Sequence, residues 1–182
     1  KGSAKSSACL QMIGIEQRKG KVCSWIDAEM TFDAKWARKL GVDTSKLIVS
    51  VAQSTNDMVD ASTELMLAGV DVNIVDSISA LLPAVYFEKD SADLKQLENT
   101  KQIGAEARDM ANAVKMLNYA NNKTSKTMLG LISQQRMKIG AMYVTAELTG
   151  GLAVKFYSGT IIKLCSSESE KQGITGKIPV GD

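Results

Sequence analysis

The sequence predicts one α/β domain in which a mostly parallel central sheet is flanked by helices. Short apolar runs alternate with helix-like stretches along most of the chain, which is the order produced by right-handed βαβ units. Two of these runs lead into carboxylates, as expected where an open α/β sheet forms its ligand crevice. With 182 residues, 45% of them hydrophobic, the chain is long enough for a single core, so residues 1–182 are assigned to one domain.

Helices are predicted where apolar residues recur at helical spacing and where capping or stop residues frame the segment. They are 7–19, 33–40, 56–68 and 103–119. Strands are predicted where short apolar runs stand between turn residues. They are 22–26, 47–51, 70–76 and 128–132, with a further pair at 154–157 and 160–165 around a turn at Ser158-Gly159. Two stretches without a clear period, 86–100 and 136–151, are predicted to be long loops.

Composition excludes several classes of protein. The chain has no run of about 18 apolar residues and no charged-then-apolar leader, so we expect no membrane partner and a cytoplasmic location. It has no histidine and three widely spaced cysteines, which excludes a zinc site or a Cys-His catalytic pair because the ligands are missing. The net charge is only +2, yet residues 51–100 carry nine acidic and two basic residues. Basic residues elsewhere could therefore form a face for a polyanion.

The first seven residues are the stretch around which the rest is organised. Residues 1–7 have the form of the end of a phosphate-binding loop, because a lysine followed by hydroxyl residues opens into a helix-like run. In this interpretation Lys5 lends charge to the phosphates of ATP and the hydroxyl of Ser6 binds Mg²⁺. The glycine expected before the lysine is replaced by Ala4, and a polar terminus without structure is the alternative. The residues assigned to the phosphates are Gly2, Ser3, Ala4, Lys5, Ser6 and Ser7.

Two carboxylates at the ends of apolar runs extend this site. Asp76 ends the run 70–76, which is where a Walker B acid would lie near the metal, opposite Ser6. Glu29 follows the run 22–26 and is a candidate to orient or deprotonate the attacking water. Asp76 could instead be an ordinary strand-end acid that caps the next turn. Together with the Lys-Ser loop, the two acids predict hydrolysis of a nucleotide with Mg²⁺.

From Lys1 to about Cys165 the sequence resembles the RecA-type DNA strand-exchange recombinases, which include bacterial and phage members. The resemblance implies a RecA-like P-loop NTPase core. The motifs that carry it are Ile26-Asp27-Ala28-Glu29, residues 36–43, Val75-Asp76-Ser77, residues 134–140, and Thr149-Gly150-Gly151 followed by Lys155-Phe156-Tyr157. Because the chain begins without methionine and inside a motif, we expect it to be a fragment of a longer protein.

The resemblance also implies roles for individual residues. Lys5, Glu29 and Gln134 would be catalytic, with Gln134 sensing the γ-phosphate at the start of a second DNA-binding loop at about 135–151. Asp33 and Trp36 would contact the adenine. A first DNA-binding loop would lie just before the helix that starts near Ile103, and Lys155-Phe156-Tyr157 would lie near a subunit interface.

The second loop also fits DNA binding on physical grounds. Arg136 and Lys138 can neutralise phosphates, and the glycines at 150 and 151 allow backbone amides to approach them. Met137 and Ile139 can wedge against bases without reading their sequence. The residues assigned to DNA are Ile103, Arg108, Lys115, Arg136, Met137, Lys138, Ile139, Thr149, Gly150 and Gly151.

The function implied by the resemblance is ATP-dependent homologous recombination. Such a protein assembles as a filament on single-stranded DNA, hydrolyses ATP when bound to DNA, and exchanges strands with double-stranded DNA at a bacterial nucleoid or on viral DNA. One alternative is a helicase-type motor of the same fold, which would share Lys5, Glu29 and Asp76 without needing the segment that begins at Gln134. The other is a non-catalytic paralogue that acts as an adaptor on a filament.

Overall fold

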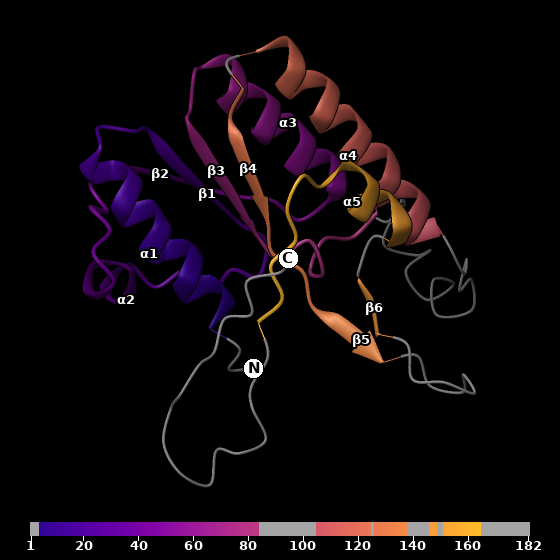
Figure 1. Ribbon diagram of the computed structural model, residues 1–182, viewed down its shortest axis with the longest axis horizontal. Helices are drawn as coiled ribbons and strands as arrows, with labels where there is room; N and C mark the ends of the chain where they lie inside the picture. Colours follow the sequence, from indigo (N-terminus) through magenta and orange to yellow (C-terminus); the bar gives the residue numbers. More distant parts are fainter. Residues whose placement is uncertain (1–3, 84–104, 125, 138–145, 149–150, 165–182) are drawn as a thin grey trace, which may run out of the picture.

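The structure is a computed structural model that describes residues 4–83, 105–124, 126–137, 146–148 and 151–164. Its centre is a four-stranded sheet of order β2-β1-β3-β4 in which every neighbouring pair is parallel (Figure 1). The strands are β1 (Cys23–Asp27), β2 (Leu47–Val51), β3 (Val72–Asp76) and β4 (Met128–Leu131). The predicted α/β class with a mostly parallel sheet is therefore confirmed.

Helices cover both faces of this sheet (Figure 1). On one face lie α1 (Lys5–Arg18) and α2 (Ala34–Lys39), and on the other lie α3 (Thr55–Leu67) and α4 (Ala105–Lys123). All four helices occupy the predicted positions to within a few residues. Helices on both faces are the arrangement that right-handed crossovers between parallel strands produce.

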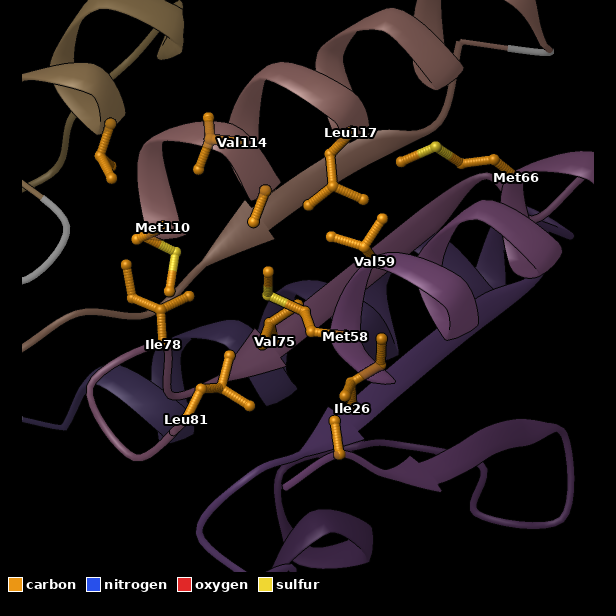
Figure 2. Packing of buried hydrophobic residues seen from close by; sticks show 13 residues of the cluster. Ile26, Met58, Val59, Met66, Val75, Ile78, Leu81, Met110, Val114 and Leu117 are labelled. Carbon is orange, nitrogen blue, oxygen red and sulfur yellow. The ribbon is translucent and has the colours of Figure 1, made fainter. Parts of the chain in front are cut away.

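Alternate residues of β1 and β3 divide the core into two clusters, because successive side chains of a strand point to opposite faces. Trp25 and Ile74 pack with α1 and α2, whereas Ile26 and Val75 pack with α3 and α4. Figure 2 shows the second cluster over Ile26 and Val75. The residues it brings together there from α3 and α4 are Met58, Val59, Met66, Met110, Val114 and Leu117. The two central strands are buried along their whole length, which fixes the sheet as a rigid base for its carboxyl edge.

Helix α1 is held on the turn that follows α2. A Cβ atom built on Gly14 would lie 2.5 Å from the carbonyl oxygen of Gly41, so the helix can approach this closely only with glycine there. One turn further on, the side-chain amide of Gln17 donates to the Asp43 carbonyl (3.0 Å) and accepts from the Asp43 backbone N–H (2.9 Å). These contacts fix the axis of α1 and hence the position of its first residues.

The strands predicted at 154–157 and 160–165 are wrong. Residues 151–157 form helix α5 (Gly151–Tyr157), and the described residues 160–164 form no strand. Val154 is buried in the cluster between α3 and α4, while Phe156 is 83% exposed. A short apolar run fits either period, and packing on α4 selects the helix here.

The loop predicted at 136–151 contains regular structure at its two ends. Strands β5 (Gln135–Met137) and β6 (Ala146–Leu148) pair antiparallel, with Arg136 opposite Glu147. The prediction of an irregular segment is therefore corrected for these residues, since each short strand satisfies the other's backbone groups. The loop predicted at 86–100 and the central part of 136–151 lie outside the described residues.

Candidate functional site

The carboxyl ends of β1 and β3 and the beginning of α1 meet at one edge of the sheet (Figure 1). Asp27 and Asp76 are in register as the last residues of their strands. Ser6 Oγ, in the first turn of α1, donates a hydrogen bond of 2.5 Å to Asp76 Oδ2. The fold thus brings together a hydroxyl and a carboxylate that are 70 residues apart in the sequence.

The start of α1 is built around Ala4. Its φ of 54° and ψ of 18° lie in the left-handed region, which alanine rarely adopts. The methyl side chain of Ala4 forms no hydrogen bond with the first amides of the helix, and amides at a helix start point toward any anion placed there. Lys5 is half-buried beside this position, and Gly2 and Ser3 lie outside the described residues.

Negative charge accumulates around Asp76. Burial raises the pKa of its carboxyl, the hydrogen bond from Ser6 lowers it, and the charges of Glu29 and Asp27 raise it further. The charge of Lys5 also lowers it, but the net effect is a raised pKa, because the side chain is almost entirely buried. Hard oxygen donors crowded in this way suit a divalent cation such as Mg²⁺, which relieves their repulsion.

The donors at this edge do not form a complete metal cage. Within the part of the chain that the structure describes, no group of three or more His, Cys, Asp or Glu side chains is arranged to hold a metal ion. Mg²⁺ commonly takes one or two protein oxygens and fills its remaining positions with water and phosphate oxygens. Ser6 and Asp76 therefore fit a Mg²⁺ site of that partial kind.

Glu29 lies at the same edge and is held by two donors. Its Oε1 atom accepts hydrogen bonds from Ser77 Oγ (2.8 Å) and from the side-chain amide of Gln134 (3.1 Å). The backbone N–H of Gln134 in turn donates to Ser79 Oγ (2.9 Å). Two of the three residues that sequence reasoning assigned to catalysis, Glu29 and Gln134, are thus in direct contact across 105 residues of sequence.

Sequence reasoning missed the residues that shape this arrangement. Asp27 accepts hydrogen bonds from the backbone N–H groups of Thr31 (3.1 Å) and Phe32 (2.8 Å), and so fixes the turn that carries Glu29. Ser77 was present in a recognised motif but had no assigned role, and Ser79 was not singled out. Nothing local marks these serines, because their partners, Glu29 and Gln134, lie in segments that follow other strands.

Asp33 and Trp36, the residues predicted to contact adenine, flank the beginning of α2. Asp33 caps this helix by accepting from the N–H groups of Lys35 (2.8 Å) and Trp36 (3.1 Å), and these bonds lower the pKa of its carboxyl. The Trp36 ring is 46% exposed and its Nε1 donates to Ser7 Oγ (3.1 Å). An exposed indole therefore stands beside the first turn of α1.

The residues assigned to DNA are spread over several elements. Arg108 and Lys115 are exposed on α4, and Arg136 and Met137 belong to β5. Helix α5, which begins at Gly151, contacts both α4 and β6. The other five, Ile103, Lys138, Ile139, Thr149 and Gly150, lie outside the described residues. Among the described helices, none is long and apolar enough to cross a bilayer.

Comparisons with known proteins identify the family. A family model described as the RecA N-terminal domain matches residues 1–178. The chain is 37% identical over 178 residues to Protein RecA of Bdellovibrio bacteriovorus, covering 96% of this chain and 45% of that protein. It is also 37% identical over 178 residues to Protein RecA of Gluconacetobacter polyoxogenes, covering 96% of this chain and 49% of that protein. The chain thus spans about half the length of these relatives, and it belongs to the RecA N-terminal domain family.

Proposed function

We propose that this chain is the ATP-hydrolysing core of a recombination protein that forms a filament on single-stranded DNA and pairs it with double-stranded DNA in the cytoplasm. The observation that carries the proposal is the meeting of four elements at one edge of the sheet. There the first turn of α1, the turn after β1, and the ends of β3 and β4 bring Ser6, Glu29, Asp76 and Gln134 together. This is the edge at which parallel α/β sheets bind ligands.

The start of α1 is proposed to hold the phosphates of ATP. Lys5 supplies a positive charge beside the helix amides, and both attract phosphate oxygens. Ser6 and Asp76 would hold Mg²⁺, which when bound neutralises charge on the phosphate oxygens. The exposed Trp36 ring, linked to Ser7, is suited to stacking on the adenine.

Glu29 is proposed to orient the attacking water and accept its proton. Glu29 is an exposed residue at this edge and its Oε1 atom is held by Ser77, so the side chain is both accessible and oriented. Gln134 would donate its amide to the γ-phosphate when ATP is present, leaving Glu29. Because Gln135 begins β5 directly after it, a movement of Gln134 would be passed to the segment proposed to bind DNA.

DNA binding is proposed for the region formed by β5, β6 and the start of α5. Arg136 and Lys138 would contact phosphates, with neighbouring apolar residues against the bases. Apolar side chains on the following segment support self-association, since Phe156 is 83% exposed and Ile162 is 75% exposed. A filament would cover such side chains by repeating one contact from subunit to subunit.

The proposal is tested by measuring ATP hydrolysis by the full-length protein with and without single-stranded DNA, together with strand exchange. Hydrolysis that depends on DNA, accompanied by strand exchange, is the expected result. Hydrolysis with duplex unwinding but without strand exchange would favour the helicase-type motor. Absence of nucleotide binding, with retained association to another recombinase's filament, would favour the adaptor. Lys5→Ala serves as the control that should abolish hydrolysis in the expected case.

A further inference from the structure

The turn that follows β3, residues 77–79, contacts both Glu29 and Gln134. Ser77 Oγ donates to Glu29 Oε1 (2.8 Å), and Ser79 Oγ accepts from the backbone N–H of Gln134 (2.9 Å). Between them, the backbone N–H of Ile78 donates to the Ile132 carbonyl (2.9 Å), and the Ile78 side chain is buried in the core (Figure 2). The turn is therefore held in place by the packing of Ile78 and by its backbone bond to Ile132, the residue after β4.

We propose that Ser77 is a positioning residue for ATP hydrolysis, which it serves by fixing the carboxylate of Glu29 in the orientation needed to engage water. The inference rests on the function proposed above and adds a residue to it. Ser77 is 1% exposed and its hydroxyl is directed at the carboxylate. A buried donor on a packed turn loses little freedom when it makes this bond, so it can fix the acceptor effectively.

The two donors to Glu29 differ in their surroundings. Both bonds reach the same oxygen, Oε1, but Ser77 is buried whereas Gln134 is exposed. An exposed amide can exchange one acceptor for another at small cost, because water satisfies it during the change. When Gln134 turns from Glu29 to a phosphate, Ser77 therefore remains as the donor that keeps Oε1 in place and Oε2 directed toward the reacting water.

The backbone of β3 links this contact to the opposite side of the site. Asp76, the residue before Ser77, accepts from Ser6 Oγ through its carboxylate. Its carbonyl oxygen accepts the backbone N–H groups of Ala28 (2.8 Å) and Glu29 (3.3 Å). Two consecutive residues thus fix the relative positions of the proposed metal-holding pair and of the proposed base, and Ser77 is the part of this link that reaches the base's side chain.

The test is steady-state ATP hydrolysis by the full-length protein carrying Ser77→Ala. We expect kcat to fall about tenfold or more, as for the loss of one hydrogen bond to a charged group. KM should change less than about twofold, because the hydroxyl is bonded to Glu29 and is not among the groups proposed to hold the nucleotide. Ser77→Thr keeps the hydroxyl and should retain most of the activity. Ser77→Cys, similar in size but a weak donor, should lose activity as Ser77→Ala does.

A matched control separates positioning from a general loss of stability. Ser62 is also a fully buried serine, located on α3, where its hydroxyl accepts from the side-chain amide of Asn73 (3.1 Å). Ser62→Ala should lower the Tm without changing kcat. If Ser77 acts through Glu29, then adding Ser77→Ala to Glu29→Gln should cause no further fall in kcat, because the group being positioned is already inactive.

Three outcomes would overturn the role of Ser77. They are wild-type kcat in Ser77→Ala or Ser77→Cys, a tenfold fall that is repeated in full on the Glu29→Gln background, and an equal fall in the folded Ser62→Ala control. If Ser77→Ala did not fold, the comparison of Ser77→Thr with Ser77→Cys would decide in the same way. A Glu29→Gln variant with normal turnover would remove Glu29 from the mechanism and the role of Ser77 with it. Absence of DNA-dependent ATP hydrolysis in the unsubstituted protein would instead refute the proposed function itself, so the two failures are distinguishable.

Discussion

The two ends of β3 carry aspartates in opposite circumstances. At the amino end, Asp71 accepts from Lys21 Nζ (2.8 Å) and from the backbone N–H of Val22 (2.9 Å), and these bonds lower the pKa of its carboxyl. At the carboxyl end, burial raises the pKa of Asp76, and the nearby carboxylates of Glu29 and Asp27 add to that rise. The charged form of the carboxyl is therefore favoured at Asp71, directly before the strand, and disfavoured at Asp76, the last residue of the strand.

The neighbouring polar groups at the two edges of the sheet differ in a similar way. At the amino edge, Thr127 Oγ1 donates to the Val70 carbonyl (2.6 Å) and the Asn121 side-chain N–H donates to the Thr127 carbonyl (2.8 Å). These donors are paired within the chain, although the buried Asn121 Oδ1 has no hydrogen-bond partner among the described residues. At the carboxyl edge, burial and the charges of Glu29 and Asp27 raise the pKa of Asp76, while the Ser6 hydroxyl and the charge of Lys5 lower it. Carboxylates with a raised pKa are common where they serve binding or catalysis. The amino edge, where Asp71 is paired with Lys21, has a stabilising role in this comparison.

Backbone conformation separates the two edges as well. Three of the four turns that lead from a helix into a strand at the amino edge take their positive φ at a glycine, and the fourth takes it at Lys126. Among the described residues of the carboxyl edge, positive φ values belong to Ala4 and Met30, both at 54°. These two residues directly adjoin Lys5 and Glu29. Two of the three described non-glycine residues with a positive φ thus adjoin the candidate site.

The largest effect is expected for Glu29→Gln. Turnover should fall about a hundredfold or more because the proposed base is lost, while ATP affinity should change little. The glutamine oxygen can still accept from Ser77 and Gln134, so the site should keep its shape. Measuring ATP affinity and kcat on the same preparation checks both parts, and unchanged turnover would remove Glu29 from the mechanism.

Gln134→Ala should break the link between the carboxyl edge and the DNA-binding segment. A hydrogen bond to a charged group contributes about 1.5–3 kcal/mol, enough for a tenfold or larger difference in DNA affinity between the ATP and ADP states. A ligand shifts such an equilibrium only through contacts that differ between the states. DNA affinity should be measured with a non-hydrolysable ATP analogue and with ADP. The variant should bind DNA equally in both, and a ratio kept at its wild-type value would rule out the switch.

The same substitution at the two ends of β3 should shift the Tm in opposite directions. The folded pKa of Asp76 is raised, so its contribution to stability is present below about pH 4 and is lost as the pH rises. Asp76→Asn should therefore raise the Tm at neutral pH. The folded pKa of Asp71 is lowered, so its contribution is present above about pH 4, and Asp71→Asn should lower the Tm there.

Nucleotide binding should separate the same pair of variants. Asp76→Asn removes a proposed metal-holding carboxylate and should weaken the binding of Mg·ATP about tenfold or more, whereas Asp71→Asn should leave it unchanged. Thermal scans at neutral pH and at pH 3 complete the comparison, because both Tm differences should shrink in acid. A lower Tm for Asp76→Asn at neutral pH would contradict the division between the edges.

The smallest effect is expected from Ala4→Gly. Removing the side chain at a φ of 54° should stabilise the start of α1 by about 1 kcal/mol and should not weaken ATP binding. Gly69, whose φ is 82° and around which a Cβ would meet no atom within 4 Å, provides the reverse experiment at the amino edge. Gly69→Ala should cost about 1 kcal/mol without affecting ATP. Chemical denaturation of the unsubstituted protein, the two single variants and the double variant measures both changes in the free energy of unfolding. A loss of stability in Ala4→Gly would show that Ala4 is not strained.

The sequence by itself determined the order of the helices and strands from α1 to β4 and the edge at which the acids lie. These features depend on local signals, such as apolar runs for buried strands and polar caps for helices. Helix α3 is an example, because Ser54 and Asp57 exchange side-chain-to-backbone bonds of 3.0 and 2.9 Å at its start. Since the carboxyl ends of parallel strands share one edge, the proximity of Glu29 and Asp76 followed from the strand prediction alone.

Only the tertiary structure decided the secondary structure of residues 151–157 and the hydrogen-bond partners of Glu29. The apolar run at 151–157 fits a strand or a helix, and its packing on α4 settles the choice in favour of helix. The bonds from Ser77 and Gln134 to Glu29 cross 48 and 105 residues of sequence. A serine has the same local appearance whether it caps a turn or holds a carboxylate, because its hydroxyl takes whichever acceptor the fold brings within reach.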